Sequence, residues 1–341
     1  MDRTPASATA ATITLDGVGK TYGDGTVAVG ALSLDVPAGD LVVLIGPSGC
    51  GKSTILRMIN RLIEPTNGRI LIDGEDITAT SAVALRRRIG YVIQHVGLFP
   101  HQSIGANIGT VPRLSGWPRA RIRARVDELL ELVGLEPARY RDRYPSELSG
   151  GQRQRIGVAR ALAADPVLLL MDEPFSAVDP IVRLRLQDEF LRLQRAVRKT
   201  IVLVTHDLDE AIRLGDSIAV LSEGGVLEQH ASPAELLSRP ANDFVARFIG
   251  ADRGVKRLSV TPVDTSRLAP VSSVDGAGSG PKVPATVMLR DALGALLDGG
   301  RDYVVVTGDD GEPIGVLTSA AIAAAAAPDA SAAAAPDASG G

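Results

Sequence analysis

The stretch GPSGCGKST, residues 46–54, follows the apolar run LVVLI and precedes the helix-like segment STILRMINRLI. Small residues at this spacing let backbone N–H groups surround a phosphate, and the start of the following helix adds favourable dipoles. Lys52 is expected to bridge the β- and γ-phosphates of a nucleotide, and the hydroxyl of Ser53 to bind Mg²⁺. The rest of the predicted nucleotide-binding loop comprises Gly46, Pro47, Ser48, Gly49, Cys50, Gly51 and Thr54.

Buried strands and helices alternate on both sides of this loop, which predicts an α/β fold with a mainly parallel sheet of the P-loop NTPase class. Residues 12–45 alternate in the manner of half-buried β-strands, and GRILIDGEDI predicts a β-hairpin. Residues 100–145 have helical character instead. We therefore expect an antiparallel β subdomain and an α-helical subdomain at about 95–165 beside the central sheet.

The composition excludes several classes of protein. The chain has 341 residues, a net charge of −4 and only 3% aromatic residues, which argues against nucleic-acid binding. The N-terminus lacks the apolar core of a signal peptide, and no apolar run approaches the length of a membrane span. The lone Cys50 cannot form an internal disulfide. We expect a soluble protein that reaches a membrane only through a partner.

Two adjacent carboxylates end the apolar strand LLLMDEP, residues 168–174. Burying such a pair is costly unless a cation is near, so Asp172 is predicted to act at Mg²⁺ and Glu173 to polarise a water against the γ-phosphate. Three further residues at strand ends are each ambiguous alone. Gln94 is a candidate for Mg²⁺ or the attacking water, His206 for the γ-phosphate and Tyr22 for stacking on a base.

A second phosphate-facing motif lies far downstream. ELSGGQRQR at 147–155 places Ser149, Gly150 and Gly151 directly before a predicted helix, which is the chemistry of an anion site. One nucleotide site does not need two such loops within one chain.

The ordered set of motifs resembles the ATP-binding subunit of ABC transporters across about residues 12–250. The matching elements are Tyr22, GPSGCGKST, Gln94, LSGGQ at 148–152, MDEP at 171–174, SAVD at 176–179 and His206. The resemblance implies an ATPase with ATP and Mg²⁺ as cofactors, Glu173, His206, Gln94 and Lys52 as catalytic residues, and Ser53, Gln94 and Asp172 around the metal.

The resemblance also implies a head-to-tail dimer of two copies of the chain. Ser149, Gly150 and Gly151 of one copy would close over the γ-phosphate held by Lys52 of the other, with Gln152 near the ribose and Asp179 at the nucleotide. This arrangement accounts for the second phosphate-facing loop.

Several longer stretches look like the ATPases of osmoprotectant importers. They include MINRLIEPTNGRILIDGEDI, IGYVIQHVGLFPH and PANDFVARFIGADRGVKRL. The implied substrates are glycine betaine, proline betaine, carnitine and choline. The implied partners are integral membrane permease subunits and, indirectly, a substrate-binding protein, which would hold the chain at the cytoplasmic face of the cell membrane.

The C-terminal segment LRDALGALLDGGRDYVVVTGDDGEPIGVLTSAAI resembles a CBS motif. The predicted organisation is a flexible leader at 1–11, the ATPase domain at 12–250, a linker or degenerate segment at 251–285, a CBS-like α+β segment at 286–322 and a disordered low-complexity tail at 323–341. Whether the CBS-like segment binds a ligand or only docks stays open.

Two other functions compete with an importer ATPase. A soluble ABC ATPase acting on ribosomes or DNA is disfavoured by the single cassette and the acidic charge balance. A nucleotide-binding sensor with incidental hydrolysis is disfavoured by the presence of Glu173, Gln94 and His206.

Overall fold

The computed structural model describes residues 10–94, 97–176, 178–274 and 280–326, with the side chain of residue 181 also left aside. The chain divides into two compact units, Met1–His230 and Ala231–Gly341. The boundary between the units lies after residue 230, whereas the sequence suggests a boundary after residue 250. The two helices within 233–249 therefore belong to the C-terminal unit.

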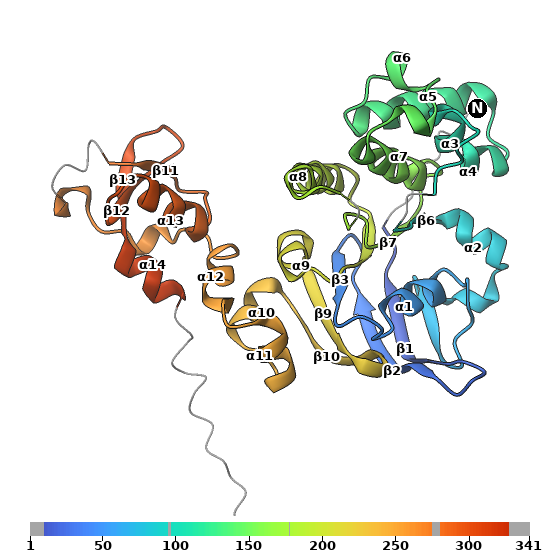
Figure 1. The fold of residues 1–341 in the computed structure, drawn as a ribbon, viewed down its shortest axis with the longest axis horizontal. Coiled ribbons are helices and arrows are strands. Elements are labelled where there is room, and N and C mark those ends of the chain that lie inside the picture. The colour runs from blue at the N-terminus through green and yellow to red at the C-terminus, as the bar shows by residue number, and fades with distance from the viewer. Residues whose placement is uncertain (1–9, 95–96, 177, 275–279, 327–341) are drawn as a thin grey trace, which may run out of the picture. The chain divides into compact units, whose positions relative to one another are not determined.

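The first unit is built on a six-stranded sheet with the order β10-β9-β3-β8-β7-β6 (Figure 1). The strand β3 pairs in parallel with β8 and β9, and β7 pairs in parallel with β8 and β6. Strands such as LVVLI are buried along their whole length, as expected where both faces of a parallel sheet are covered. The bounds are β3 (Leu41–Ile45), β6 (Ile89–Val92), β7 (Leu168–Asp172), β8 (Thr200–Val204), β9 (Ser217–Ser222) and β10 (Val226–Ala231).

A second, antiparallel sheet has the order β2-β1-β4-β5. Its residue Ile13 lies opposite both Val36 of β2 and Ile72 of β4. The bounds are β1 (Ile13–Thr21), β2 (Val27–Val36), β4 (Asn67–Ile72) and β5 (Glu75–Asp76). One apolar core takes side chains from both sheets and from the helix α1 (Lys52–Ile59), so the phosphate loop that precedes α1 has a rigid foundation.

The helix α1 is shorter than the sequence suggests, because it ends at Ile59 rather than continuing to Ile63. Arg61 takes a positive φ of 46°, and the N–H of Leu62 donates to the carbonyl of Arg57, which closes the helix in a turn.

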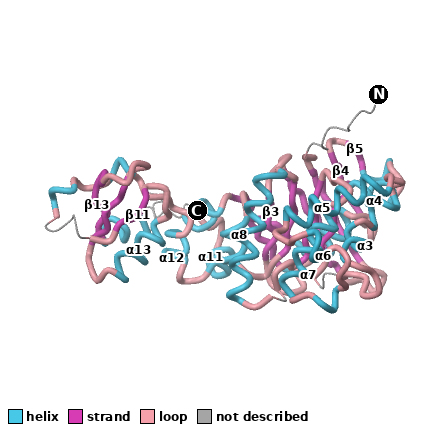
Figure 2. The backbone as a smooth tube through the Cα atoms, turned by 90° about the horizontal axis from the view of Figure 1, so that it is seen from above, coloured by secondary structure: helices cyan, strands magenta, loops and turns pink. Residues whose placement is uncertain are grey.

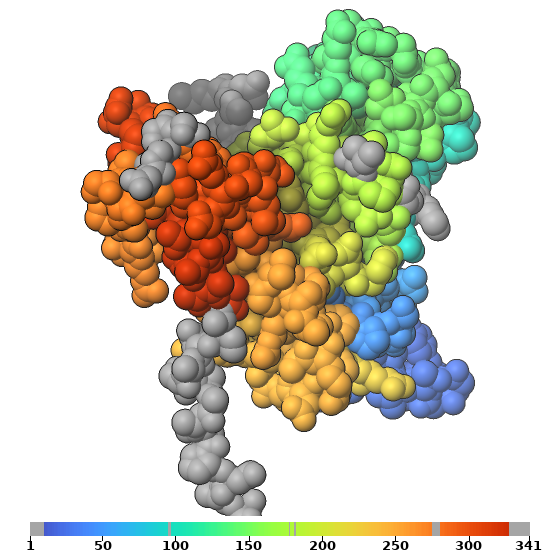
Figure 3. Space-filling view, turned by 60° about the vertical axis from the view of Figure 1, so that its left-hand side comes forward, coloured from blue at the N-terminus to red at the C-terminus, as the bar shows by residue number. Residues whose placement is uncertain are grey.

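The predicted helical subdomain is present between β6 and β7. In Figure 1 its helices form a group, drawn in green, at the β6 edge of the six-stranded sheet. A Cβ on Gly90 of β6 would lie 2.6 Å from the carbonyl oxygen of Ala161 in this subdomain. In Figure 3 the surface of the subdomain is continuous with that of α8. The helices of the first unit after α1 are α2 (Ala82–Arg88), α3 (Ile104–Ile108), α4 (Thr110–Leu114), α5 (Arg119–Leu132), α6 (Pro137–Tyr140), α7 (Gly150–Leu162), α8 (Pro180–Val197) and α9 (Leu208–Leu214), with short 3₁₀ turns η1 (Ile77–Ala79), η2 (Pro145–Glu147) and η3 (Glu223–Gly225).

The second unit carries a three-stranded sheet with the order β11-β12-β13 (Figure 2). The antiparallel strands β12 and β13 form a hairpin, and Gly311 at its turn has a φ of +78°. The elements are α10 (Pro233–Ser238), α11 (Asp243–Ile249), α12 (Arg253–Leu258), η4 (Thr265–Arg267), η5 (Val271–Ser273), β11 (Lys282–Pro284), α13 (Leu289–Asp298), β12 (Tyr303–Thr307), β13 (Pro313–Thr318) and α14 (Ser319–Ala326).

The described part of the segment 251–285, expected to be a linker or a degenerate segment, packs into this unit. Leu258, Val263 and Val283 are buried in the same apolar core as α13, and the N–H of Ala269 donates to the carbonyl of Val316. The hydrophobic pattern of the sequence does not predict that these residues are buried, because they are isolated apolar positions among Pro, Gly and Ser.

Both predicted disordered ends lie mainly outside the described residues, namely 1–9 and 327–341. Ala11, assigned to the leader, is fully buried, and its carbonyl accepts a hydrogen bond from the hydroxyl of Thr200. No helix in the described ranges is long and apolar enough to cross a membrane.

Candidate functional site

The phosphate loop connects β3 to α1, and its glycines are required sterically. A Cβ on Gly46 would lie 2.2 Å from the carbonyl oxygen of Leu221, and one on Gly51 would lie 2.4 Å from that of Ala28. Gly51 also has a φ of +101°, a conformation that side chains disfavour. The loop therefore holds its shape only because these positions have no side chain.

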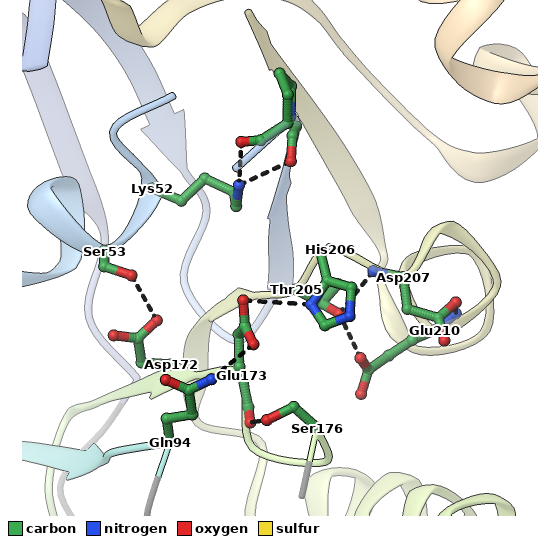
Figure 4. A network of polar contacts seen from close by, with 12 residues as sticks. Lys52, Ser53, Gln94, Asp172, Glu173, Ser176, Thr205, His206, Asp207 and Glu210 are labelled. Atoms are coloured by element: carbon green, nitrogen blue, oxygen red, sulfur yellow. Dashed lines mark hydrogen bonds and ion pairs between the residues drawn. The ribbon is translucent and has the colours of Figure 1, made fainter. Parts of the chain in front are cut away.

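Lys52 begins α1 and is almost fully buried against the loop that precedes it. Its Nζ donates to the carbonyls of Gly46 (2.7 Å) and Pro47 (2.8 Å), and lies 3.6 Å from Sγ of Cys50 (Figure 4). The first turn of α1 contains no acidic residue. A lysine ammonium and a free helix N-terminus thus meet at one place, which is the electrostatics of a phosphate site.

Ser53 and Asp172 are brought together although they are far apart in sequence. The hydroxyl of Ser53 donates to Oδ1 of Asp172 at 2.9 Å. Loss of hydration raises the pKa of the Asp172 carboxyl, and the hydrogen bond from Ser53 opposes that rise. A hydroxyl and one carboxylate beside a phosphate loop are oxygen ligands of the kind Mg²⁺ takes together with substrate phosphates, so these residues fit the metal.

Glu173 follows β7 in a strained conformation. Its φ of +46° lies in the left-handed region, and its N–H donates to the carbonyl of Val204 at the end of β8. Such strain in a residue other than glycine is typical of functional sites that the surrounding fold holds in place.

The side chain of Glu173 meets two of the predicted catalytic residues (Figure 4). Its Oε2 accepts a hydrogen bond from Nε2 of Gln94 at 3.0 Å, and its Oε1 lies 3.3 Å from Nδ1 of His206. The three residues follow the neighbouring parallel strands β6, β7 and β8, so the carboxyl-end edge of the sheet brings them together.

Tyr22 lies in the turn between β1 and β2 with its side chain partly exposed. The ammonium of Lys20 lies 5.7 Å from the centre of its ring. Further along β2, the carbonyl of Ala28 approaches Gly51 of the phosphate loop. This hairpin therefore runs beside the loop, and base stacking by Tyr22 remains a prediction.

The LSGGQ segment forms the start of α7, as predicted. The side chain of Ser149 accepts from the N–H of Gln152, and Oε1 of Gln152 accepts from the N–H of Ser149, which makes a capping box. Nε2 of Gln152 donates to the hydroxyl of Tyr140, so both polar groups of this side chain are engaged within the chain.

The chain does not bring this segment to its own phosphate loop. Gly151 packs toward α8, where a Cβ would lie 3.2 Å from Val182, while Ser149 and Gly150 are exposed. Within the described ranges no hydrogen bond connects 149–152 to 46–54. Asp179 immediately precedes α8, and its contact with a nucleotide remains a prediction.

The sequence analysis missed a polar network behind His206. Hydrogen bonds connect Thr205 to both Asp207 and Glu210 (Figure 4). The N–H of Glu210 also donates to Asp207, and Nε2 of Gln187 in α8 donates to the Glu210 carboxylate. The only sequence signal for Glu210 is an acidic residue three positions after Asp207, the residue that caps α9. Most acidic side chains in the first turn of a helix are exposed to solvent, so this signal does not predict a buried carboxylate.

Comparisons with known proteins agree with this geometry. The family model described as ABC transporter matches residues 29–176. The osmoprotectant import ATP-binding protein OsmV of Salmonella typhimurium is 50% identical over 85% of this chain and 74% of its own. The glycine betaine uptake system ATP-binding protein YehX of Escherichia coli is 49% identical over 85% and 92%, and the glycine betaine/carnitine/choline transport ATP-binding protein OpuCA of Bacillus subtilis is 57% identical over 70% and 62%.

Solved structures show the same fold. The protein cbiO1 from Clostridium perfringens, part of the ABC transporter complex cbiONQ, superposes with a TM-score of 0.62 and 28% identity over 67% of this chain and 91% of its own. A dimer of the ATP-binding cassette MJ0796 in a post-hydrolysis state bound to ADP and Pi superposes with a TM-score of 0.58 and 33% identity over 65% and 98%.

The phosphate loop, the paired carboxylates and these relatives define the class. The chain belongs to the ATP-binding proteins of ABC transporters and is an ATPase of that family. Within the family, it falls among the ATP-binding proteins of osmoprotectant uptake systems.

Proposed function

We propose that the chain hydrolyses ATP to drive uptake of an osmoprotectant of the quaternary-amine type, such as glycine betaine, proline betaine, carnitine or choline, through a separate membrane permease. The observation that carries the chemistry is the meeting of Glu173, Gln94 and His206 beside the phosphate loop. The substrate class is supported by the curated relatives, which serve glycine betaine, carnitine and choline transport.

In the proposed mechanism the N–H groups of the phosphate loop and the ammonium of Lys52 bind the β- and γ-phosphates. The ammonium then contacts phosphate oxygens in place of the carbonyls of Gly46 and Pro47. Ser53, Asp172 and Gln94 would hold Mg²⁺, whose charge neutralises phosphate oxygens. Glu173 orients the attacking water and accepts its proton at a carboxylate oxygen. His206 contacts the γ-phosphate, and positioning supplies most of the catalysis.

The second phosphate-facing loop is proposed to act in trans. Ser149 and Gly150 are exposed at the N-terminus of α7, a helix of 13 residues, and the structure keeps them away from the loop at 46–54 of the same chain. A two-fold, head-to-tail pair would present them to the γ-phosphate at Lys52 of the other copy. The MJ0796 dimer with ADP and Pi supports this arrangement.

The protein is proposed to lie at the cytoplasmic face of the membrane through the permease, with a substrate-binding protein as the indirect partner that selects the cargo. The C-terminal unit is proposed to contain a CBS-like element, because the helix α13 is followed by the hairpin β12–β13 within the CBS-like segment at 286–322.

Mixed dimers test the site in trans. Lys52→Met disables the phosphate loop of one copy, and Ser149→Arg disables the LSGGQ segment, so neither variant alone should hydrolyse ATP. In a 1:1 mixture, half of the dimers pair the two variants and keep one intact site, which predicts about a quarter of wild-type turnover if sites act independently. A mixture as inactive as its parents would contradict the arrangement in trans.

Transport is tested separately. Cells that express the chain with its permease and binding protein should accumulate radiolabelled glycine betaine, and Lys52→Met should abolish uptake. ATP hydrolysis without uptake of any of the four quaternary amines would contradict the proposed cargo and leave the ATPase chemistry standing.

A further inference from the structure

His206 sits in a short turn whose backbone is held on both sides. The turn leads from β8 into α9, with Thr205 before the histidine and Asp207 after it. The N–H of Asp207 donates to the hydroxyl oxygen of Thr205 at 3.1 Å. The carboxylate of Asp207 caps α9 by accepting from the N–H groups of Asp209 (2.9 Å) and Glu210 (3.2 Å). Placement of the histidine thus depends on the Thr205 hydroxyl and the Asp207 cap.

The imidazole itself has little packing to hold it. The side chain of His206 is 58% exposed, and its Nδ1 lies 3.3 Å from Oε1 of Glu173. Because the ring is mostly exposed, the backbone of the turn decides where it lies. A shift of this turn would separate His206 from Glu173.

Glu210 controls the direction of the hydrogen bond that fixes the turn. It is only 5% exposed, and its Oε2 accepts the Thr205 hydroxyl at 2.5 Å while its Oε1 accepts from Nε2 of Gln187 at 3.4 Å. A hydroxyl has one proton to donate. Because Thr205 gives that proton to Glu210, its lone pairs face the N–H of Asp207.

The helix α8 supports the same turn from a second side. Arg183 places Nη1 3.4 Å from Oδ2 of Asp207, and its Nη2 donates to the carbonyl of Val178 at 3.3 Å. The turn is therefore tied to the segment that precedes α8, where the predicted nucleotide contact Asp179 lies.

Burial of Glu210 has a cost that packing does not explain. Loss of hydration raises the pKa of its carboxyl, and the neighbouring Asp207 adds to the rise, while hydrogen bonds from Thr205 and Gln187 and the charge of Arg183 oppose it. A buried carboxylate in an otherwise apolar setting is expensive. The hydrogen bond that its carboxylate accepts from the Thr205 hydroxyl leads to the turn that carries His206, and the one from Gln187 connects it to α8.

We propose that Glu210 is a positioning residue for His206: its carboxylate orients the Thr205 hydroxyl, the hydroxyl holds the N–H of Asp207, and the turn keeps the imidazole beside Glu173. This inference rests on the proposed role of His206 in ATP hydrolysis. In this proposal the buried Glu210 acts through Thr205 and not on the reacting atoms.

A matched pair of substitutions isolates the hydroxyl. Thr205→Val keeps the branched shape and removes the hydroxyl, whereas Thr205→Ser keeps the hydroxyl. In the full-length protein we expect Thr205→Val to lower kcat about tenfold with KM for ATP within about twofold of wild type, and Thr205→Ser to retain kcat within about twofold. Glu210→Leu should match Thr205→Val, and Glu210→Gln, whose amide oxygen still accepts a hydrogen bond from the Thr205 hydroxyl, should retain most of the turnover.

The deciding measurement repeats the pair in a His206→Ala background. If Glu210 and Thr205 act through His206, the difference between Val and Ser at position 205 should shrink to less than about twofold there. A tenfold difference in both backgrounds, or none in either, would overturn the inference. Wild-type turnover in His206→Ala alone would overturn the proposed role of His206 and the inference with it, so the two failures are distinguishable.

Discussion

Replacement of Glu173 by glutamine tests the centre of the site with little change of shape. The substitution keeps the length of the side chain and removes the negative charge that accepts from Gln94 at 3.0 Å and faces His206 at 3.3 Å. An amide is a very poor proton acceptor, so the attacking water loses its base. Loss of a general base typically costs about 10²–10⁴ in rate, or roughly 2.7–5.4 kcal/mol of the activation barrier.

Nucleotide binding should survive this change, because Lys52 and the phosphate loop make no hydrogen bond with the Glu173 side chain among the contacts of the described residues. We therefore expect phosphate release to fall at least about a hundredfold while the Kd for ATP stays within about twofold. With ATP bound and not consumed, the variant should also remain dimeric in size-exclusion chromatography.

The exposed Glu64 provides the matched control. Its exposed carboxylate pairs with Arg61, which is not one of the site residues, so Glu64→Gln should leave turnover within about twofold of wild type whatever its effect on stability. A Glu173→Gln variant that hydrolyses ATP at more than about a tenth of the wild-type rate would refute the assignment of Glu173 as the base.

Three further predictions concern the loop, a buried ion pair and pH. Gly46→Ala places a Cβ 2.2 Å from a backbone carbonyl of β9, so we expect about 1–3 kcal/mol loss of stability in urea unfolding together with weaker binding of fluorescent ATP analogues; unchanged binding would contradict the fit. Asparagine, like aspartate, tolerates the φ of +54° at position 165, so Asp165→Asn removes only the charge that lies 2.8 Å from the ammonium of the buried Lys199. This substitution should lower the free energy of unfolding by about 2–3 kcal/mol in the same assay. The pKa of Glu210 is raised on folding, so the folded state holds that proton more tightly and stability falls as pH rises from the ordinary glutamate value through the raised one. Glu210→Gln should therefore be more stable than wild type at neutral pH, and this gain should vanish in acid below the ordinary glutamate pKa; a gain of equal size at both pH values would contradict the titration.

Motifs with local chemistry were predictable from the sequence. The phosphate loop lies between a buried strand and a helix that begins at Lys52, and LSGGQ opens α7 with a capping box. In both cases the residues that define the motif also make its local structure, so a linear pattern suffices. The proximity of Gln94, Glu173 and His206 was predictable only in part, because each residue follows a parallel strand and parallel strands end at the same edge of a sheet.

Features that depend on distant burial were not predictable. In the sequence, 251–285 is expected to be a linker or a degenerate segment because its apolar residues are isolated, and in the structure Leu258 and Val263 are buried beside α13. Ala11 likewise belongs to the core rather than to a leader. A periodic apolar pattern identifies the buried face of one helix or strand. It does not identify single apolar residues that fill space between other elements.

By itself, then, the sequence determined the nucleotide chemistry, the α/β class and the family, because these depend on residue types at short spacing. Only the tertiary structure decided that Asp172 meets Ser53, that Glu173 is held in a left-handed conformation between Gln94 and His206, and that Glu210 is buried beneath the histidine's turn. Those facts depend on which strand ends lie together and which carboxylates lose their water. Burial and close approach are properties of the packed chain, so no local pattern carries them.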